Sequence, residues 1–397
     1  MKLHNEACFL ATTGLVLLSC SDRAIDAAPT SGSQRERAAV SQSALGVSSH
    51  ALLPRLTAAP ETMGSTVPAN GDLNPYGVAF VPSGFPSGGI LRPGDVLVSN
   101  FNDGGDGGNL QGTGTSIVRV NPGGAPTLFF AGAALQGLST ALGVLREGLV
   151  LVGNLPSLDG SGSCNAGDGG QELAVGQGAI TILDRRGRAL QTLADAALLD
   201  GPWDMAVDDD GERAAVFVSN ALSGTVTRLR LRVRDDGVTV DSMTQIASGY
   251  AHRCDPAAFV VGPTGLALDE EDDVLYVAST GDNAIYAVDH AETTSRDRGP
   301  GRVVVGDAAH LHGPLGLART PTGHLISAQG DAVNPDPSQP NEIVEFSADG
   351  SFLSEFSIDP APGSAFGIAL ERSRGVLRFA AVDDGANQLD EWVLKTP

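Results

Sequence analysis

Positively charged residues are scarce in this sequence compared with negatively charged ones. Its 397 residues include 25 Lys and Arg against 47 Asp and Glu, for a formal net charge of −22. The cationic side chains are dispersed, so a phosphate backbone would be repelled and no nucleic-acid partner is expected. We interpret the acidity as the surface of a soluble protein that works outside the cytoplasm.

Aromatic residues are also few, with 13 Phe, 4 Tyr and 2 Trp beside 51 Gly. Glycine-rich turns between short runs of Val, Leu and Ala suit many short strands and offer little support for long helices. The length is sufficient for one large core, so one globular domain preceded by a tail is expected.

No long hydrophobic run stands at the N-terminus either. The apolar stretch Cys8–Leu18 is too short to span a bilayer, but it has the length of a signal-peptide core. It ends in Leu17-Leu18-Ser19-Cys20, which resembles the lipobox of bacterial lipoproteins. The resemblance implies a signal peptide over residues 1–19 and lipidation of Cys20. An ordinary signal peptide followed by an incidental cysteine is the alternative.

The lipobox resemblance also implies a cellular location. A multiply acylated Cys20 would anchor the protein stably, and Ser21 fits sorting to the outer membrane. We therefore expect an exported lipoprotein whose membrane partner is reached through the lipid. Residues 20–70, rich in Ala, Ser, Thr, Pro, Gly and Gln, are expected to form a flexible tether whose last part supplies a strand.

Only four cysteines are present. Cleavage would remove Cys8 and lipidation would use Cys20, which leaves Cys164 and Cys254. Two remaining cysteines in an oxidising compartment predict one disulfide between them, with two free thiols as the alternative.

What the sequence does contain is a repeated unit, clearest at Gly262–Asp289 (GPTGLALDEEDDVLYVASTGDNAIYAVD). Three short apolar runs rich in Val, Ile and Tyr, separated by turn formers, predict three antiparallel strands. The unit recurs six times in order, which predicts an all-β fold, a six-bladed β-propeller of four-stranded blades. Unrelated hairpins or a β-sandwich would not explain six copies. The central residues of the copies are Gly77, Gly143, Asp204, Gly265, Gly316 and Gly367.

The fourth-blade sequence resembles an NHL repeat. The chain from about Leu73 to Leu394 is similar to the wider six-bladed superfamily that includes gluconolactonases, paraoxonases, strictosidine synthases and streptogramin lyases. The resemblance implies a propeller over residues 71–397 but no activity. Gluconolactonase-like proteins supply metal ligands from a Glu-Gly-Pro in blade one, where this chain has Leu73-Asn74-Pro75. No functional residue is therefore transferred from the family.

Blade six provides only three strands before the printed sequence ends. An open blade would leave an unpaired sheet edge, so a fourth strand is expected from the segment before Asn74. The two candidate stretches are His50–Ala59 and Gly64–Ala69.

Three asparagines, Asn100, Asn154 and Asn220, end the second strands of blades one to three. Their amides could bind a metal or a polar ligand at an axial funnel, or they could cap turns. The matching places in the other blades are near Ser279, Ala328 and Ala381.

Four further residues are candidates for the same face or for the axis. His310 and His312 form a His-x-His that could ligate Zn or Cu, with His252 nearby, although ordinary loop histidines would look the same. Asp204 replaces the glycine of its blade, so it could be a ligand or an acid or base near the axis. It could equally be a strand residue bonded to backbone.

Two loops rich in Gly and Asp, Asn100–Ser116 and Ser157–Glu172, carry oxygen ligands that could suit Ca²⁺ or another divalent metal. Neither loop has EF-hand spacing, so solvated loops are the alternative. Cys164 lies in the second loop and Cys254 leads into blade four, which should bring both to one face. The candidate ligands are Asp103, Asp106, Asn109, Asp159 and Asp168.

No catalytic motif is present: the chain lacks a G-x-S-x-G elbow, and its GTGTS lacks the Lys of a phosphate loop. The first hypothesis is therefore an exported, membrane-anchored module that binds or scaffolds a protein, a glycan or a small polar ligand. The alternative is a metal-dependent hydrolase or lyase in the axial funnel. A purely structural envelope protein is the third option.

Overall fold

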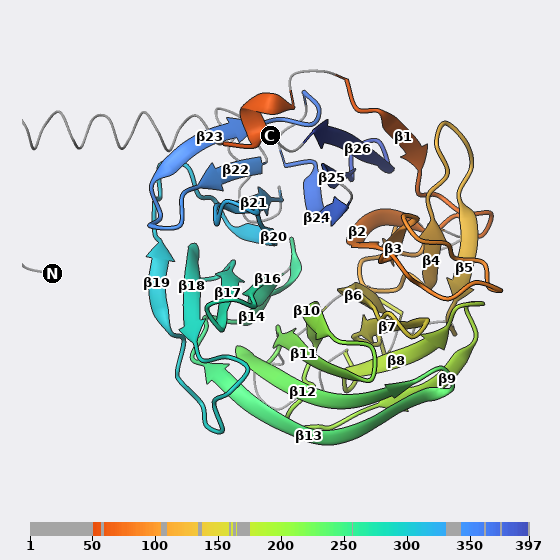
Figure 1. Cartoon of the computed structure of the whole chain (residues 1–397), viewed down its shortest axis with the longest axis horizontal. Coiled ribbons are helices and arrows are strands. Elements are labelled where there is room, and N and C mark those ends of the chain that lie inside the picture. The colour runs from red at the N-terminus through yellow and green to blue at the C-terminus, as the bar shows by residue number, and fades with distance from the viewer. Residues whose placement is uncertain are drawn as a thin grey trace, which may run out of the picture. The chain divides into compact units, whose positions relative to one another are not determined.

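Six four-stranded antiparallel sheets surround a central axis as the blades of a β-propeller (Figure 1). In this computed structural model the predicted six-bladed, all-β architecture is confirmed. The residues described are 51–56, 59–104, 109–133, 137–158, 160–161, 164, 175–255, 257–330, 343–360, 363–373 and 375–395.

The first strand of each blade lies innermost and contacts the first strands of the two neighbouring blades. Short strands with small residues suit this crowded position. In chain order these strands are β2 (Leu73–Phe80), β6 (Leu138–Val144), β10 (Pro202–Asp209), β16 (Pro263–Asp269), β20 (Pro314–Arg319) and β24 (Ala365–Ser373).

The second strands are buried on both faces because each blade packs between two others. Every residue of β7 and of β17 is buried, which explains why these strands read as continuous apolar runs rather than as alternating ones. The second strands are β3 (Val96–Asn102), β7 (Leu149–Asn154), β11 (Arg213–Asn220), β17 (Val274–Ser279), β21 (Leu325–Gln329) and β25 (Val376–Asp383).

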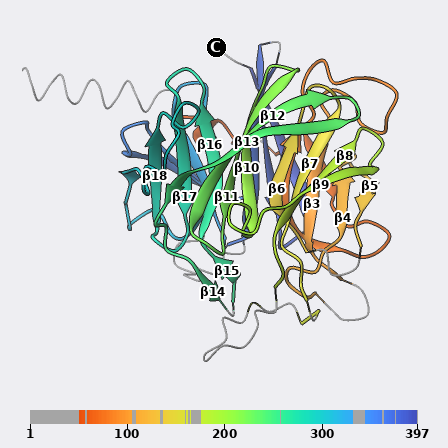
Figure 2. The ribbon, with the colours of Figure 1, turned by 90° about the horizontal axis from the view of Figure 1, so that it is seen from below.

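The third and outermost strands widen the ring, and two of them, β12 and β13, form a long ribbon (Figure 2). The third strands are β4 (Ser116–Arg119), β8 (Ala179–Asp184), β12 (Thr225–Arg234), β18 (Ala284–Asp289), β22 (Ile343–Phe346) and β26 (Gln388–Lys395). The outermost strands are β5 (Thr127–Ala131), β9 (Ala189–Leu193), β13 (Gly237–Ser248), β19 (Arg302–Val305), β23 (Phe352–Phe356) and β1 (Thr62–Ser65).

Backbones approach so closely at the axis that only glycine fits at several places. A Cβ added to Gly316 would lie 2.5 Å from the carbonyl oxygen of Phe366, and one added to Gly367 would lie 1.7 Å from that of Tyr76. Each glycine thus packs on the residue that precedes the central position of the next blade. This contact defines the repeat in three dimensions.

The same contact corrects the predicted alignment in blade two. A Cβ on Gly77 would meet the carbonyl oxygen of Thr140 at 2.5 Å, so the central residue of blade two is Ala141 and not Gly143. The strand register agrees, because a pairing shift precedes Leu142. Blade two lacks the Pro-x-Gly signature, and the nearest glycine was therefore the wrong marker.

The N-terminal segment closes blade six, as predicted. Strand β1 pairs with β26, with Thr62 opposite Glu391 and Ser65 opposite Gln388. A short 3-10 helix, η1 (Leu53–Arg55), precedes it and packs its leucines with Phe379 and other apolar residues of blades five and six. The closing strand therefore overlaps the start of the second candidate stretch.

The chain divides into two units, Met1–Gly46 and Val47–Pro397, and all the described elements belong to the second. Ala51, the first residue that the structure describes, is buried. The expected signal peptide and Cys20 lie outside the described residues. In the described part of the chain, no helix has the length and apolar character to cross a membrane.

A buried carboxylate fastens the N-terminal segment to blade five. Glu345 on β22 is fully buried and accepts hydrogen bonds from the backbone N–H groups of Leu52 (2.7 Å) and Leu53 (2.9 Å). The Nδ1 atom of His324 lies 2.8 Å from its other oxygen. Because a buried carboxylate is costly unless several donors surround it, this clasp fixes where the segment docks.

We expect Glu345→Gln to destabilise the fold by about 3 kcal/mol, because the amide places N–H groups against N–H donors. The measurement is urea unfolding of the full chain. Glu355→Gln on the exposed surface of β23 is the matched control. A change at Glu345 no larger than that of the control would contradict the clasp.

Candidate functional site

A cavity of about 500 Å³ lies on the axis at the face where the inner strands begin and the second strands end. Its lining combines an apolar floor with a polar rim. Concave sites of this size and mixed lining are typical of small-molecule binding.

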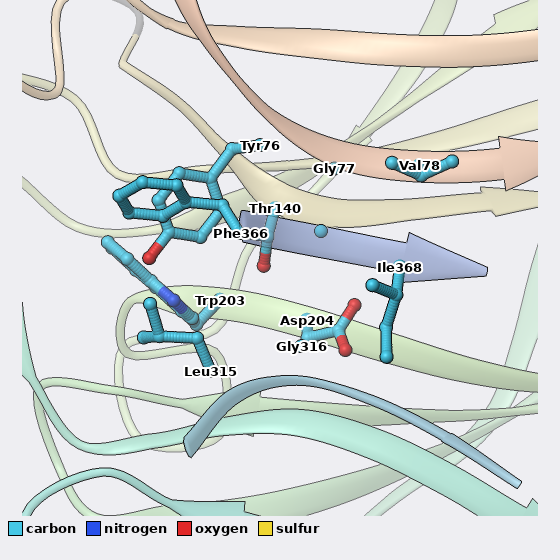
Figure 3. Close-up of a pocket in the computed structure, with 11 residues that line it drawn as sticks. Tyr76, Gly77, Val78, Thr140, Trp203, Asp204, Leu315, Gly316, Phe366 and Ile368 are labelled. Carbon is cyan, nitrogen blue, oxygen red and sulfur yellow. The ribbon is translucent and has the colours of Figure 1, made fainter. Parts of the chain in front are cut away.

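Aromatic side chains form the floor. Tyr76, Trp203 and Phe366 occupy the same place in blades one, three and six, immediately before the central residue (Figure 3). The ring centroids of Tyr76 and Phe366 are 4.8 Å apart, and those of Tyr76 and Trp203 are 5.6 Å apart. Phe101 joins the group with its centroid 5.3 Å from that of Trp203. A chain with few aromatic residues thus concentrates several at its axis.

Side-chain amides and one carboxylate form the rim. Asn102 donates from Nδ2 to Oδ1 of Asn109 at 2.7 Å, and Gln111 donates from Nε2 to the carbonyl oxygen of Ala257 at 3.0 Å. Asp384, after β25, is the one ionisable side chain apart from the Tyr76 phenol among the described residues that line the cavity.

Several buried polar atoms at this cavity have no hydrogen-bond partner in the described part of the chain. They are Nε1 of Trp203, Oδ1 of Asn102 and Oδ1 of Asn74. An unpaired buried polar group costs about 1–3 kcal/mol, and Asn74 also holds a left-handed backbone with φ of 58°. Such strain and unmet hydrogen bonding are characteristic of binding sites.

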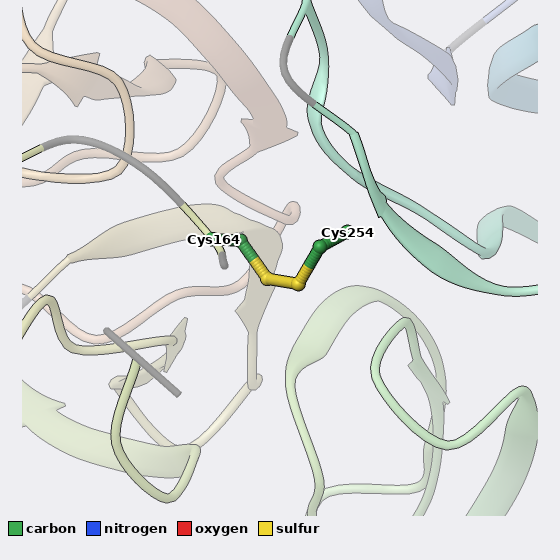
Figure 4. Close-up of a disulfide and its surroundings, with 2 residues drawn as sticks. All are labelled: Cys164 and Cys254. Atoms are coloured by element: carbon green, nitrogen blue, oxygen red, sulfur yellow. A yellow bond between two sulfur atoms is a disulfide. The ribbon is translucent and has the colours of Figure 1, made fainter. Parts of the chain in front are cut away.

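A hairpin of β14 (Arg253–Asp255) and β15 (Phe259–Val261) extends below the blades (Figure 2) and supplies one wall of the cavity. Cys254 of this hairpin forms a disulfide with Cys164, 90 residues earlier, with 5.2 Å between the Cα atoms (Figure 4). The ring of Phe259 lies 5.7 Å from that of Phe101. The disulfide and this contact hold the wall against the axis.

Asp204 lines a second, much smaller axial cavity of about 30 Å³, which shares Tyr76, Trp203 and Phe366 with the larger one (Figure 3). Its carboxylate accepts hydrogen bonds from the backbone N–H groups of Met205 (2.8 Å) and Leu266 (3.0 Å). Burial raises the pKa of Asp204 to about 7, and these two hydrogen bonds act in the opposite direction. Asp204 thus lies near the axis and also bonds to backbone.

The three predicted asparagines are buried and are not among the lining residues of either axial cavity. Asn100 donates from Nδ2 to the carbonyl oxygen of Thr66 at 2.9 Å. Asn220 donates to the carbonyl oxygen of Leu198 at 3.2 Å and accepts from the backbone N–H of Asp200. These two amides hold the loop that leads into their own blade.

The strand register shows that the residues predicted to match the three asparagines in blades five and six are wrong. Gln329 and Asp383, not Ala328 and Ala381, pair with the first residue of the inner strand as Asn220 does. The predicted places were therefore one residue early in blade five and two residues early in blade six. The Gln329 amide accepts from the backbone N–H of His312, so it also holds an incoming loop.

The predicted histidines lie apart from the axial lining. His310 places Nδ1 2.7 Å from Asp307 and stacks on Phe352 with centroids 3.7 Å apart. His312 approaches the carbonyl oxygen of Ala309, and His252 that of Tyr250. Within the described ranges, no three His, Cys, Asp or Glu side chains are grouped so that they could hold a metal.

The two acidic loops are described only in part. Asp103 is exposed and forms an isolated bridge with Leu110, whereas Asn109 lines the axial cavity. Asp106, Asp159 and Asp168 lie outside the described residues. The sequence did not identify Tyr76, Trp203 or Phe366, although each directly precedes a central repeat position.

Comparison with solved structures supports the fold. No protein-family model and no curated protein matches the sequence. A gluconolactonase from Xanthomonas campestris matches with a TM-score of 0.51 and 16% identity, over 87% of this chain and 93% of that chain. A calcium-binding regucalcin from Agrobacterium tumefaciens gives a TM-score of 0.48 and 14% identity, over 84% and 95%. At these identities the likeness is one of fold.

The first hypothesis, that the protein is a module that binds or scaffolds a partner, is wrong. A protein named as a gluconolactonase shares the fold over nearly all of its length, and this chain has a concave axial cavity rather than a flat docking face. The alternative, a metal-dependent hydrolase or lyase with its site in the axial funnel, agrees better with both findings.

Asp204 predicts a pH dependence of stability. Its pKa is about 7 when folded against 3.8 for an ordinary aspartate, so the folded state holds the proton more tightly. This stabilisation is complete below the unfolded pKa and is lost as the pH rises towards 7. We expect Asp204→Asn, which cannot titrate, to show a flatter curve of Tm against pH between 4 and 7.

Asp236→Asn, in the exposed turn between β12 and β13, is the control for the loss of one charge. Its curve should run parallel to that of the unaltered protein. Parallel curves for Asp204→Asn as well would contradict the raised pKa.

Proposed function

We propose that this chain is a hydrolase or lyase that acts on a small, uncharged molecule in the axial cavity. The observation that carries the proposal is the position of Asp384. It is the one carboxylate among the described residues that line an otherwise neutral cavity with an aromatic floor. A lone carboxylate beside apolar surface is suited to moving a proton to or from a bound substrate.

The lining also indicates the substrate. Tyr76, Trp203 and Phe366 provide apolar surface for a ring or a short chain, and the rim provides amide groups for one or two polar atoms. No Lys, Arg or His is among the described lining residues, so a negatively charged substrate would face Asp384 without compensation. A neutral lactone, ester or carbonyl compound fits these properties.

The chemistry follows from the same groups. Asp384 would act as general base. In hydrolysis it would take a proton from the water that attacks the carbonyl carbon and return it to the departing oxygen; in elimination it would take a proton from the carbon next to a carbonyl as the β substituent leaves. The amide N–H groups of Asn109 and Gln111 would stabilise the negative charge that develops on the substrate oxygen. The floor would exclude water from the remaining faces of the substrate.

A divalent metal at this site is a possibility that the sequence raises. Among the residues that the structure describes, no three His, Cys, Asp or Glu side chains are grouped so that they could hold one. The proposal therefore routes no step through a metal.

The test is a screen of the purified full chain with neutral lactones, esters and β-substituted carbonyl compounds. Asp384→Asn should lower kcat/KM for any compound turned over by about 100-fold or more, which is the usual contribution of a general base. Asp236→Asn is the matched control and should retain full activity. Equal rates for Asp384→Asn and the control would overturn the proposed role.

Trp203→Phe tests binding separately from proton transfer. It keeps an aromatic floor but removes the indole N–H, so KM should rise while kcat changes little. Unchanged KM and kcat in Trp203→Phe would place the indole N–H outside the substrate contacts.

We further propose that the protein is exported and lipid-anchored, as the stretch that ends at Cys20 indicates. The Cys164–Cys254 disulfide supports an oxidising compartment. We also propose, on the sequence of blade four, that the chain is related to NHL-repeat propellers. This relationship does not distinguish an exported protein from a cytoplasmic one. Metabolic labelling with palmitate, lost in Cys20→Ala, is the test of the lipid anchor.

A further inference from the structure

A second large cavity lies at the outer rim, between the edges of blades five and six. We call it the rim groove; its volume is about 550 Å³. The turn between β25 and β26 separates it from the axis, since Asp384 lines the axial cavity and Asp383 lines the rim groove. The residues that carry the argument are Met63, Phe356, Asp359, Asp383, Asp390 and Trp392.

Two of its carboxylates are buried without a cation. Asp383 is 2% exposed and Asp390 is 3% exposed, and neither forms an ion pair with a described residue. Asp390 accepts one hydrogen bond at Oδ1, from Nε2 of Gln388 at 3.2 Å. Its Oδ2 receives none from the described part of the chain. Asp390 is therefore a nearly buried carboxylate with a single hydrogen bond from the described residues, and it lines the rim groove, where a donor could reach its Oδ2.

The carboxylates also repel one another. Burial raises the pKa of Asp390 to about 6, and the charges of Asp383 and Asp359 act in the same direction. Burial and Asp359 likewise raise the pKa of Asp383. A positive charge in the rim groove would relieve this repulsion.

The lining beside these carboxylates is aromatic and apolar, and Met63 on β1 pairs directly with Asp390 on β26. Phe356 and Trp392 stand edge to face with ring centroids 5.6 Å apart, and Met63 is 50% exposed. The carboxylates are not grouped as metal ligands are. An occupant that fits both the carboxylates and the apolar lining must therefore carry a positive charge and an apolar body.

We propose that the rim groove binds a small organic ammonium ion with an apolar body. The ammonium group would lie against Asp390 and Asp383, and the body would cover Met63 and the rings of Phe356 and Trp392. This site is independent of the axial cavity and of the activity proposed for it.

Calorimetric titration of the full chain at pH 8 with phenethylammonium, compared with the neutral 2-phenylethanol, tests the proposal. The ammonium compound should bind at least about tenfold more tightly, and Asp390→Asn should reduce its affinity about tenfold. Asp236→Asn is the charge-matched control and should bind as the unaltered protein does. Equal affinity for the two compounds, or no effect of Asp390→Asn, would overturn the proposal.

A second measurement covers the case in which Asp390→Asn does not fold. Binding to the unaltered protein should weaken about tenfold between pH 8 and pH 5, because Asp390 becomes protonated below its pKa of about 6. Asp383 from β25 and Asp359 from the segment after β23 are the charged groups that face it. Trp203→Phe should leave binding unchanged, since that residue lines the axial cavity only. Affinity that does not vary with pH, or that falls in Trp203→Phe, would contradict the rim groove as the site.

Discussion

The close approach of the inner strands around the axis is the constraint on which the other features depend. A side chain at Gly316 would collide with the carbonyl oxygen of Phe366, and one at Gly367 would collide with that of Tyr76. In both cases the oxygen belongs to the residue just before the central position of the next blade. Because the central positions stay small, residues just before them, such as Tyr76 before Gly77 and Phe366 before Gly367, can meet at the axis. The aromatic floor is therefore a consequence of how the ring closes. The β1–β26 pairing and the Glu345 clasp then hold that closure from outside.

Repetition made the fold predictable. Short apolar runs, turn residues and a recurring Pro-x-Gly are local signals, and six copies leave little choice of architecture. The closing strand followed from the same count, because a three-stranded blade exposes an edge. Where the local signal was missing, as in blade two, the alignment moved to Gly143 and was wrong by two residues.

The candidate site was much less predictable. Asn100 and Asn220 attracted attention as possible ligands, yet their amides hold incoming loops. Trp203 and Asp384 carry no motif, and their importance comes from what lies across the axis from them. Sequence patterns report spacing along one strand, whereas a propeller builds its site from different blades. Asp204 was singled out because it broke the repeat, and that signal did lead to the axis.

The axial cavity lined by Trp203 is the proposed substrate-binding site. Trp392→Phe would leave Trp203 as the single tryptophan of the chain, so its fluorescence would report on the cavity alone. Titration of this variant with a neutral compound that the protein is found to turn over should give a saturable change whose midpoint matches KM. Turnover of that compound with no saturable change in Trp203 fluorescence would show that the chemistry occurs elsewhere.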